Sequence, residues 1–116
     1  MSLVEAGTEG SEGLVVVLTT VADEASAQAL ARALLDAELA ACVQLSRIES
    51  LYRWEGEVVS EPEVRLVVKT PAARRTALVD ALLARHPYDV PQIVVLGADA
   101  VHGPYLDWAR EVTGGV

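Results

Sequence analysis

The sequence has 116 residues, 52% of them hydrophobic, and its 17 acidic and 9 basic side chains give a formal net charge of −8. This length accommodates one domain with a substantial core, and the hydrophobic fraction excludes a disordered chain. The acidic balance argues against nucleic acid as a partner, because phosphate backbones are bound by basic surfaces. No apolar run approaches the ~20 residues that a membrane-spanning helix needs, so no membrane partner is expected.

Residues 1–13 are rich in Glu, Gly and Ser. They lack the basic start and the apolar stretch of a secretory signal, and they indicate a flexible N-terminal tail. We therefore expect a cytoplasmic protein whose folded domain covers residues 14–113.

The first two predicted elements of this domain are a strand and a helix. Residues 14–20 form a continuous apolar, β-branched run, which is typical of a strand buried on both faces. Asp23 can then cap a helix that runs to about Leu39. Four apolar residues recur at three- and four-residue intervals and predict the buried face of this helix: Ala27, Leu30, Leu34 and Ala37.

Residues 42–70 predict a long ribbon of two β-strands. The strands meet at residues 55–57, where Gly56 can supply the positive φ that a tight reversal needs. The returning strand alternates cleanly, but the outgoing strand changes the phase of its apolar residues between Leu45 and Ile48. This change predicts a β-bulge or kink at residues 46–47. The tip of the ribbon is expected to overhang the sheet, and an overhanging strand edge invites a partner.

The second half of the domain repeats the pattern of helix and strand. Thr70 is expected to cap a helix with Pro71 at its first position, and this helix ends near His86. The proline-rich segment that follows is an extended loop, because each proline disfavours the helical conformation in the residue before it. Residues 92–96 predict a fourth strand, and residues 104–112 predict a short last helix.

This order of elements predicts an α+β fold of the ferredoxin-like βαββαβ type, with a long β-hairpin and an extra C-terminal helix. Right-handed crossovers are expected to place the first and last strands in the centre of the sheet and the hairpin strands outside. The two main helices would cover one face of the sheet. The other face is also rich in valine, so we expect a second copy of the chain to bury it.

The aromatic residues and the polar residues beside them are the candidate functional groups. They lie in three places: Tyr52 and Trp54 on one face of the ribbon, Tyr88 in the proline-rich loop, and Tyr105 and Trp108 on one face of the last helix. They suit either of two roles, as interface and core aromatics or as the walls of a cleft. In the second case, the polar groups of the cleft would be Arg53, Lys69 and Gln92. The sequence contains no motif of a hydrolase, a metalloprotease or a phosphate-binding loop, so no enzymatic activity is expected.

Five motifs together resemble the CutA family of divalent-cation tolerance proteins. Two of them are specific: Tyr-x-Trp-x-Gly at residues 52–56 and His-Pro-Tyr-Asp-Val-Pro at residues 86–91. The others are residues 41–44, 69–70 and 105–108, so the similarity covers about residues 14–112. The resemblance implies a ferredoxin-like subunit similar to the PII nitrogen-regulatory proteins, assembled as a homotrimer through its ribbons.

The resemblance also implies that the protein binds divalent metal ions, Cu²⁺ first, and takes part in the response to metal ions. The usual candidate ligands of the family correspond to Cys42 and His86. Thiolate and imidazole suit copper, and imidazole also suits zinc and nickel. From the residues alone, each has an ordinary alternative role: Cys42 as a small apolar residue of a strand, and His86 as a partner of the helix dipole.

Two other functions fit the same sequence. The first is a PII-like sensor that binds a small anionic or nucleotide-like molecule in clefts between subunits, through Trp54, Lys69 and Trp108. The second is a structural scaffold, in which the trimer anchors another protein through its outer surface.

Overall fold

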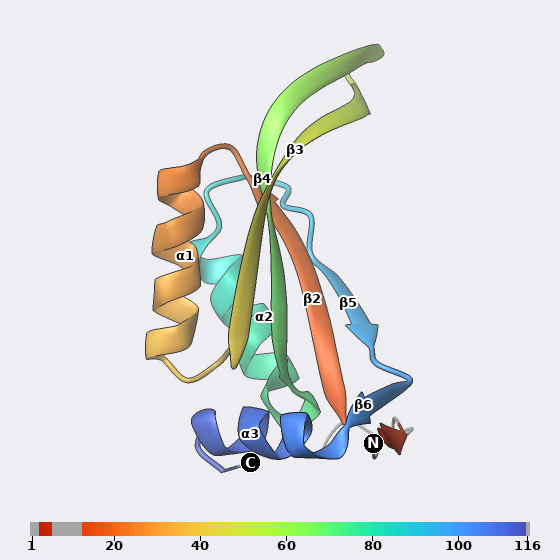
Figure 1. Ribbon diagram of the computed structural model, residues 1–116. Coiled ribbons are helices and arrows are strands. Elements are labelled where there is room, and N and C mark those ends of the chain that lie inside the picture. The colour runs from red at the N-terminus through yellow and green to blue at the C-terminus, as the bar shows by residue number, and fades with distance from the viewer. Residues whose placement is uncertain (1–2, 6–12, 116) are drawn as a thin grey trace.

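The computed structural model describes residues 3–5 and 13–115. Its elements, drawn in Figure 1, are β1 (Leu3–Glu5), β2 (Leu14–Val21), α1 (Glu24–Asp36), β3 (Cys42–Trp54), β4 (Glu57–Pro71), a 3₁₀ turn (Ala72–Arg74), α2 (Arg75–Arg85), β5 (Val94–Gly97), β6 (Ala100–His102) and α3 (Gly103–Val112). The α+β fold with a long hairpin and a C-terminal helix is confirmed.

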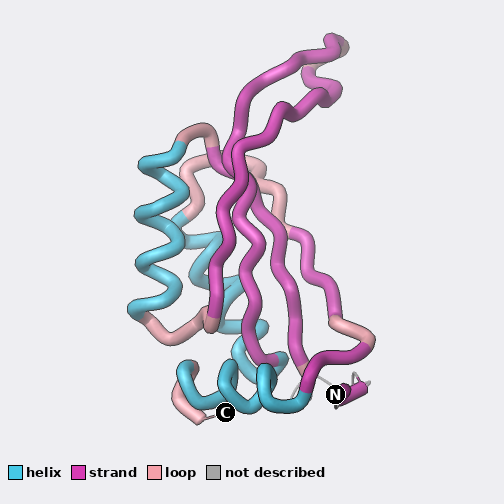
Figure 2. Tube along the Cα trace, in the orientation of Figure 1, coloured by secondary structure: helices cyan, strands magenta, loops and turns pink. Residues whose placement is uncertain are grey.

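The main sheet has four antiparallel strands in the order β3-β4-β2-β5 (Figure 2). The first long strand, β2, is central and β3 of the hairpin is at an edge, as predicted. The predicted central position of the last long strand was wrong, because β5 is at an edge and β4 of the hairpin takes the central position instead. The hairpin explains the order. β2 pairs along its whole length with residues 64–71 of β4, β3 pairs with the other edge of β4, and β5 pairs with the other edge of β2.

A second, two-stranded sheet joins β1 to β6, with Leu3 opposite His102. The sequence predicted a flexible tail for residues 1–13 and no strand between the predicted strand 92–96 and the last helix, whereas the structure places a short strand in each of these two segments. Three-residue strands are too short to show a period of two, so neither could be recognised from the pattern. The rest of the expected tail, apart from Gly13, lies outside the described residues.

The β3–β4 ribbon extends far beyond the sheet, as Figure 1 shows at its upper end. Its pairing runs without interruption from Cys42 opposite Lys69 to Trp54 opposite Glu57, so the predicted bulge was wrong. The phase of the apolar residues changes because the packing partner changes. Val43 packs on the helical core, whereas Ile48 is half-buried on the opposite face, where the ribbon has left the sheet.

The ribbon reverses in a two-residue turn. Glu55 has a φ of 49° and Gly56 a φ of 81°, the left-handed pair that matches the twist of a tight hairpin. The predicted positive φ at Gly56 is therefore confirmed.

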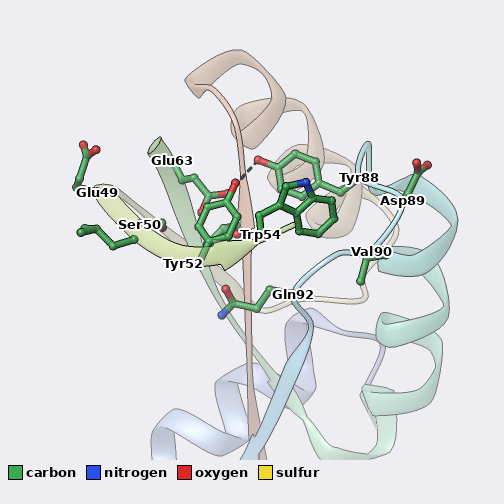
Figure 3. A pocket seen from close by; sticks show the side chains of 11 residues that line it. Glu49, Ser50, Tyr52, Trp54, Glu63, Tyr88, Asp89, Val90 and Gln92 are labelled. Atoms are coloured by element: carbon green, nitrogen blue, oxygen red, sulfur yellow. Dashed lines mark hydrogen bonds between the residues drawn. The ribbon is translucent and has the colours of Figure 1, made fainter. Parts of the chain in front are cut away.

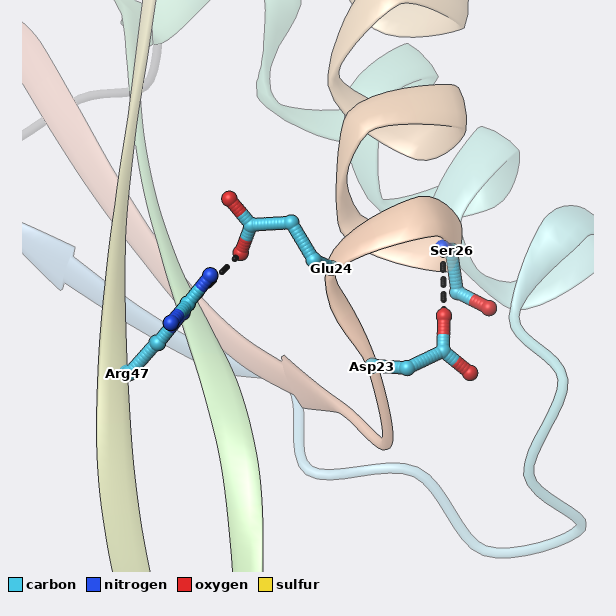
Figure 4. Close-up of polar contacts among 4 residues, drawn as sticks. All are labelled: Asp23, Glu24, Ser26 and Arg47. Atoms are coloured by element: carbon cyan, nitrogen blue, oxygen red, sulfur yellow. Dashed lines mark hydrogen bonds and ion pairs between the residues drawn. The ribbon is translucent and has the colours of Figure 1, made fainter.

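Helix α1 begins as predicted at the Asp23 cap. The Asp23 carboxylate accepts a hydrogen bond of 2.7 Å from the Ser26 backbone N–H, which lowers the pKa of Asp23 (Figure 4). The buried stripe includes Ala27, Leu30 and Leu34. Ala37 is exposed instead, because the helix ends at Asp36.

Replacing Asp23 with alanine is expected to fray the first turn of α1, because the Ser26 N–H loses its acceptor. Amide hydrogen exchange at Ser26 should become faster, on the order of fivefold. Asp23→Asn, which keeps an oxygen at the same place, serves as the control and should exchange like the original protein. Equal exchange rates for the alanine and asparagine variants would show that the cap contributes nothing.

Thr70 does not cap the second helix, so that prediction was wrong. Its hydroxyl donates a 2.8 Å hydrogen bond to the Leu39 carbonyl, and it ties the end of α1 to β4. Strand β4 continues through Pro71, and the 3₁₀ turn then delays the start of α2 to Arg75. The Thr-Pro pair, which predicted the start of a helix, instead forms the end of strand β4.

The two faces of the sheet are unequal. On one face, α1 and α2 cover a core that includes Val17, Leu66, Val68, Leu34 and Leu82 (Figure 1). Strand alternation places a different apolar group on the opposite face. This open-face cluster is half-buried or exposed and consists of Val16, Leu18, Val67, Val94 and Leu96.

Helix α3 lies across the end of the sheet that is farthest from the ribbon tip (Figure 1). Leu106 and Ala109 pack in a second small core with Leu14, Ala41 and Val101. Arg74 fixes its end, since Nε and Nη2 donate to the Thr113 carbonyl at 2.9 and 2.7 Å.

Candidate functional site

His86 lies directly after α2 and is held on both sides of its ring. Its Nδ1 accepts the backbone N–H of Tyr88 at 3.1 Å, so the proton of the neutral ring lies on Nε2. Nε2 is 2.9 Å from the Thr20 carbonyl and 3.1 Å from the Thr19 hydroxyl. Burial lowers the pKa of His86 and favours this neutral form. Both ring nitrogens are therefore engaged in holding the loop after α2 against β2.

This environment makes a prediction about pH. Since the pKa of His86 in the folded protein lies below its ordinary value of 6.5, the unfolded chain takes up the proton first as the pH falls. The contribution of His86 to stability is complete above about pH 6.5 and is lost as the pH falls below it. Urea unfolding at pH 7.5 and pH 5.5 should show a smaller acid-induced loss in His86→Gln than in the original protein. Equal losses in both would contradict the assigned role.

Cys42 lies at the opposite end of the sheet, at the start of β3. It is half-buried and directly opposite Lys69 of β4. Burial raises the pKa of Tyr105, and the neighbouring Cys42 side chain adds to this rise. The rings of Tyr105 and Trp108 have centroids 5.4 Å apart. The structure thus joins Cys42, Lys69, Tyr105 and Trp108 in one group beside α3.

The structure does not bring Cys42 and His86 together. Cys42 lies in the row of paired residues that contains Lys69 and Val16, whereas His86 contacts Thr20, four residues farther along β2. Four residues of a strand span about 13 Å. Within residues 3–5 and 13–115, no three His, Cys, Asp or Glu side chains gather closely enough to hold a metal ion. The described part of one chain therefore does not contain a complete metal centre.

The described residues do form a cleft of about 730 Å³ between the ribbon and the loop after α2 (Figure 3). Its lining combines aromatic and aliphatic residues with polar and acidic ones: Leu51, Tyr52, Trp54, Tyr88 and Val90, and Thr20, Glu49, Ser50, Glu63, Asp89 and Gln92. The predicted aromatic walls from the ribbon and the loop thus meet, with Gln92 beside them. Lys69, Tyr105 and Trp108 lie in the other group, and Arg53 is not part of the lining.

Two tyrosines of the cleft, Tyr88 and Tyr52, interact with glutamates of β4. The Tyr88 hydroxyl donates a 2.9 Å hydrogen bond to Oε2 of Glu63, and burial and this carboxylate both raise the pKa of Tyr88. The pKa of Tyr52 is also raised, by desolvation and by contact with Glu61. The rings of His86 and Tyr88 are 4.9 Å apart, so the histidine supports the wall from behind. The cleft is therefore continuous with the His86 network and separate from the Cys42 group.

Sequence reasoning missed most of the acidic side of this cleft. Neither Glu49 nor Glu63 was predicted as a residue of the cleft. The signal was present in the two-residue turn, because a pairing of Trp54 with Glu57 implies that Ile48 faces Glu63 and Ser50 faces Glu61. This register places Glu61 and Glu63 on the face that carries Tyr52 and Trp54.

Comparison with known proteins gives concordant results. The family model described as CutA1 divalent ion tolerance protein matches residues 15–112. The divalent-cation tolerance protein CutA of Thermus thermophilus is 46% identical over 100 residues, which cover 85% of this chain and 97% of that protein.

Solved structures show the same relationship. The structure of CutA from Synechococcus elongatus superposes with a TM-score of 0.88 at 39% identity, and covers 97% of this chain and 96% of its own. A structure described as the periplasmic divalent cation tolerance protein CutA from Archaeoglobus fulgidus has a TM-score of 0.83 at 29% identity, over 86% of this chain and 98% of that one. Among the described residues, no helix has the length and apolar character needed to cross a membrane.

Proposed function

Because the chain belongs to the CutA1 divalent ion tolerance family, we propose that it acts as a homotrimer that binds divalent cations, copper first, and contributes to the response to metal ions. The observation that carries this proposal is the unequal sheet. The open-face cluster of Val16, Leu18, Val67, Val94 and Leu96 offers a contiguous apolar surface on the face opposite α1 and α2.

The edges of the sheet support assembly through the ribbon. Within the described residues, the outer edges of β3 and β5 pair with no other strand, and unpaired edges are ready to add a strand from another chain. The ribbon also exposes a large apolar side chain on the face of β3 that points away from Tyr52 and Trp54, where Leu51 is 69% exposed. Burial of Leu51 between copies would stabilise a trimer.

For copper, we place the ligand at Cys42. It is half-buried on β3, directly opposite Lys69, and a cysteine sulfur is a soft donor that suits copper. His86 is a less suitable donor, because a metal bond would replace its hydrogen bond to Thr20 or to Tyr88. Since residues 3–5 and 13–115 of one chain do not gather three ligands, a neighbouring subunit would complete the site. We place the trimer in the cytoplasm, where a single cysteine stays reduced, and we propose binding rather than catalysis.

The test combines light scattering with a copper titration. The original protein should have the mass of three chains and bind copper to saturation. Cys42→Ala should weaken this binding at least about tenfold, because a thiolate is the softest donor available. His86→Gln is the matched control and should retain the copper affinity. A single-chain mass, or equal copper binding in Cys42→Ala and the original protein, would overturn the proposal.

A further inference from the structure

The cleft between the ribbon and the loop after α2 is lined by acidic groups. Among residues 13–115, its charged lining consists of Glu49, Glu63 and Asp89, and contains no lysine or arginine. Residues 49–63, which form the tip of the ribbon, carry five glutamates and one arginine. That arginine, Arg53, is not part of the cleft lining, and by strand alternation it lies with Glu49 and Leu51 on the other face of β3 from Tyr52 and Trp54. The register places Glu61 and Glu63 on the face of Tyr52 and Trp54. The electrostatic potential of the cleft therefore favours a cation.

The acidic groups are spread along the cleft, with its aromatic rings between them. In Figure 3, Tyr52, Trp54 and Tyr88 gather near Glu63, whereas Glu49 and Asp89 stand at opposite ends. A bare divalent ion needs several oxygen ligands at about 2–2.6 Å, and the carboxylates here do not converge in that way. An organic cation suits this spacing better, because its charge and its apolar body can contact different parts of the cleft.

Each part of such a ligand finds a partner of matching chemistry. Glu63 uses one oxygen to accept the Tyr88 hydroxyl, and an ionised carboxylate has further acceptor positions for an ammonium N–H. The faces of Trp54 and Tyr52 attract a cation through their π-systems. Val90 supplies aliphatic surface for the body of the ligand. The volume of about 730 Å³ is within the usual range of small-molecule sites.

We propose that this cleft is a binding site for a small organic amine in its ammonium form, with Glu63 as the counter-ion and Tyr52, Trp54 and Tyr88 as the aromatic wall. The charge is opposite to that of the anionic ligand expected from the sequence. That expectation combined Trp54 with Lys69 and Trp108, and the fold places the last two at the other end of the sheet, beside Cys42. The amine site is independent of metal binding at Cys42.

A matched pair of probes tests the sign of the charge. Phenethylamine and phenylacetate carry the same ring on a short chain, with an ammonium on one and a carboxylate on the other. Calorimetric titration of the full-length protein with EDTA present should give saturable binding of phenethylamine and none of phenylacetate. Equal affinities, or no saturable binding of the amine because a neighbouring copy fills the cleft, would overturn the proposal.

Two charge-removing variants then locate the site. Glu63→Gln keeps the shape and an acceptor for Tyr88, and should weaken phenethylamine binding at least about tenfold through the loss of its charge-assisted hydrogen bond. Glu111→Gln, on α3 away from the cleft, removes the same charge and should leave the affinity unchanged. Equal effects of the two variants would show that the amine senses only the general acidity of the surface.

Tryptophan fluorescence provides a readout at the cleft itself. The sequence contains two tryptophans, so Trp108→Phe leaves Trp54 as the sole reporter. Phenethylamine should change its emission with the same saturation midpoint as in calorimetry. A calorimetric signal without any change in Trp54 emission would place the bound amine elsewhere and overturn the assignment.

Discussion

Replacing Leu66 with alanine should lower the free energy of unfolding by about 3 kcal/mol, because the truncation leaves a cavity in a well-packed core. Leu66 is completely buried in β4, one of the two central strands, opposite Leu45 on one side and Thr19 on the other. Its face of the sheet is the one that α1 and α2 cover. Urea unfolding followed by circular dichroism measures the change.

The control for this prediction is Val58→Ala in the same strand. Val58 is 63% exposed near the tip of the ribbon, so its truncation should change the free energy of unfolding by less than about 0.5 kcal/mol. A loss for Leu66→Ala that is no larger than that for Val58→Ala would mean that the helices do not pack on this face as described.

Leu96→Lys should convert the proposed trimer to single chains at micromolar concentration. Leu96 belongs to the open-face cluster and is 49% exposed in one chain, so a lysine there is tolerated by the fold. In a trimer closed over this face, the ammonium would be buried without a partner, which weakens assembly by about 3 kcal/mol, or at least a hundredfold. Light scattering over a dilution series measures the effect.

Leu83→Lys is the matched control, since Leu83 is 59% exposed on α2, the helix side of the sheet. It should leave the trimer intact. Dissociation by Leu83→Lys but not by Leu96→Lys would place the contact on the helices and would overturn the proposed closure of the open face.

Local sequence signals predicted the elements of this fold well and their arrangement less well. The Asp23 cap and the positive φ at Gly56 each depend on a few neighbouring residues, and both are confirmed. Strand order depends on which strands pair across long separations in sequence, and the central position expected for the last strand was wrong. Thr70 illustrates the same limit, because its hydroxyl bonds to the distant Leu39 carbonyl instead of its own neighbours.

For the candidate site, too, the sequence predicted local features but not which distant residues lie close together. Alternation along one strand placed Tyr52 and Trp54 on a common face, and the structure brings Tyr88 to them. The distance between Cys42 and His86 follows from the positions of β2, β3 and β4 relative to one another, which no local pattern encodes. The apolar phase change near residue 46 was read as an inserted residue, whereas it records a change of packing environment along a regular ribbon.

The uninterrupted register of the ribbon restricts how its length can vary among related chains. Inserting a single residue in β3 between Ile48 and Tyr52 would turn Tyr52 and Trp54 to the face that now carries Arg53, and the cleft would lose two of its walls. Removing two residues from each strand at paired positions would keep every face and shorten the ribbon by about 7 Å. Viable relatives should therefore differ in ribbon length by even, matched steps, so that ribbon length and the chemistry of the cleft can change independently of each other.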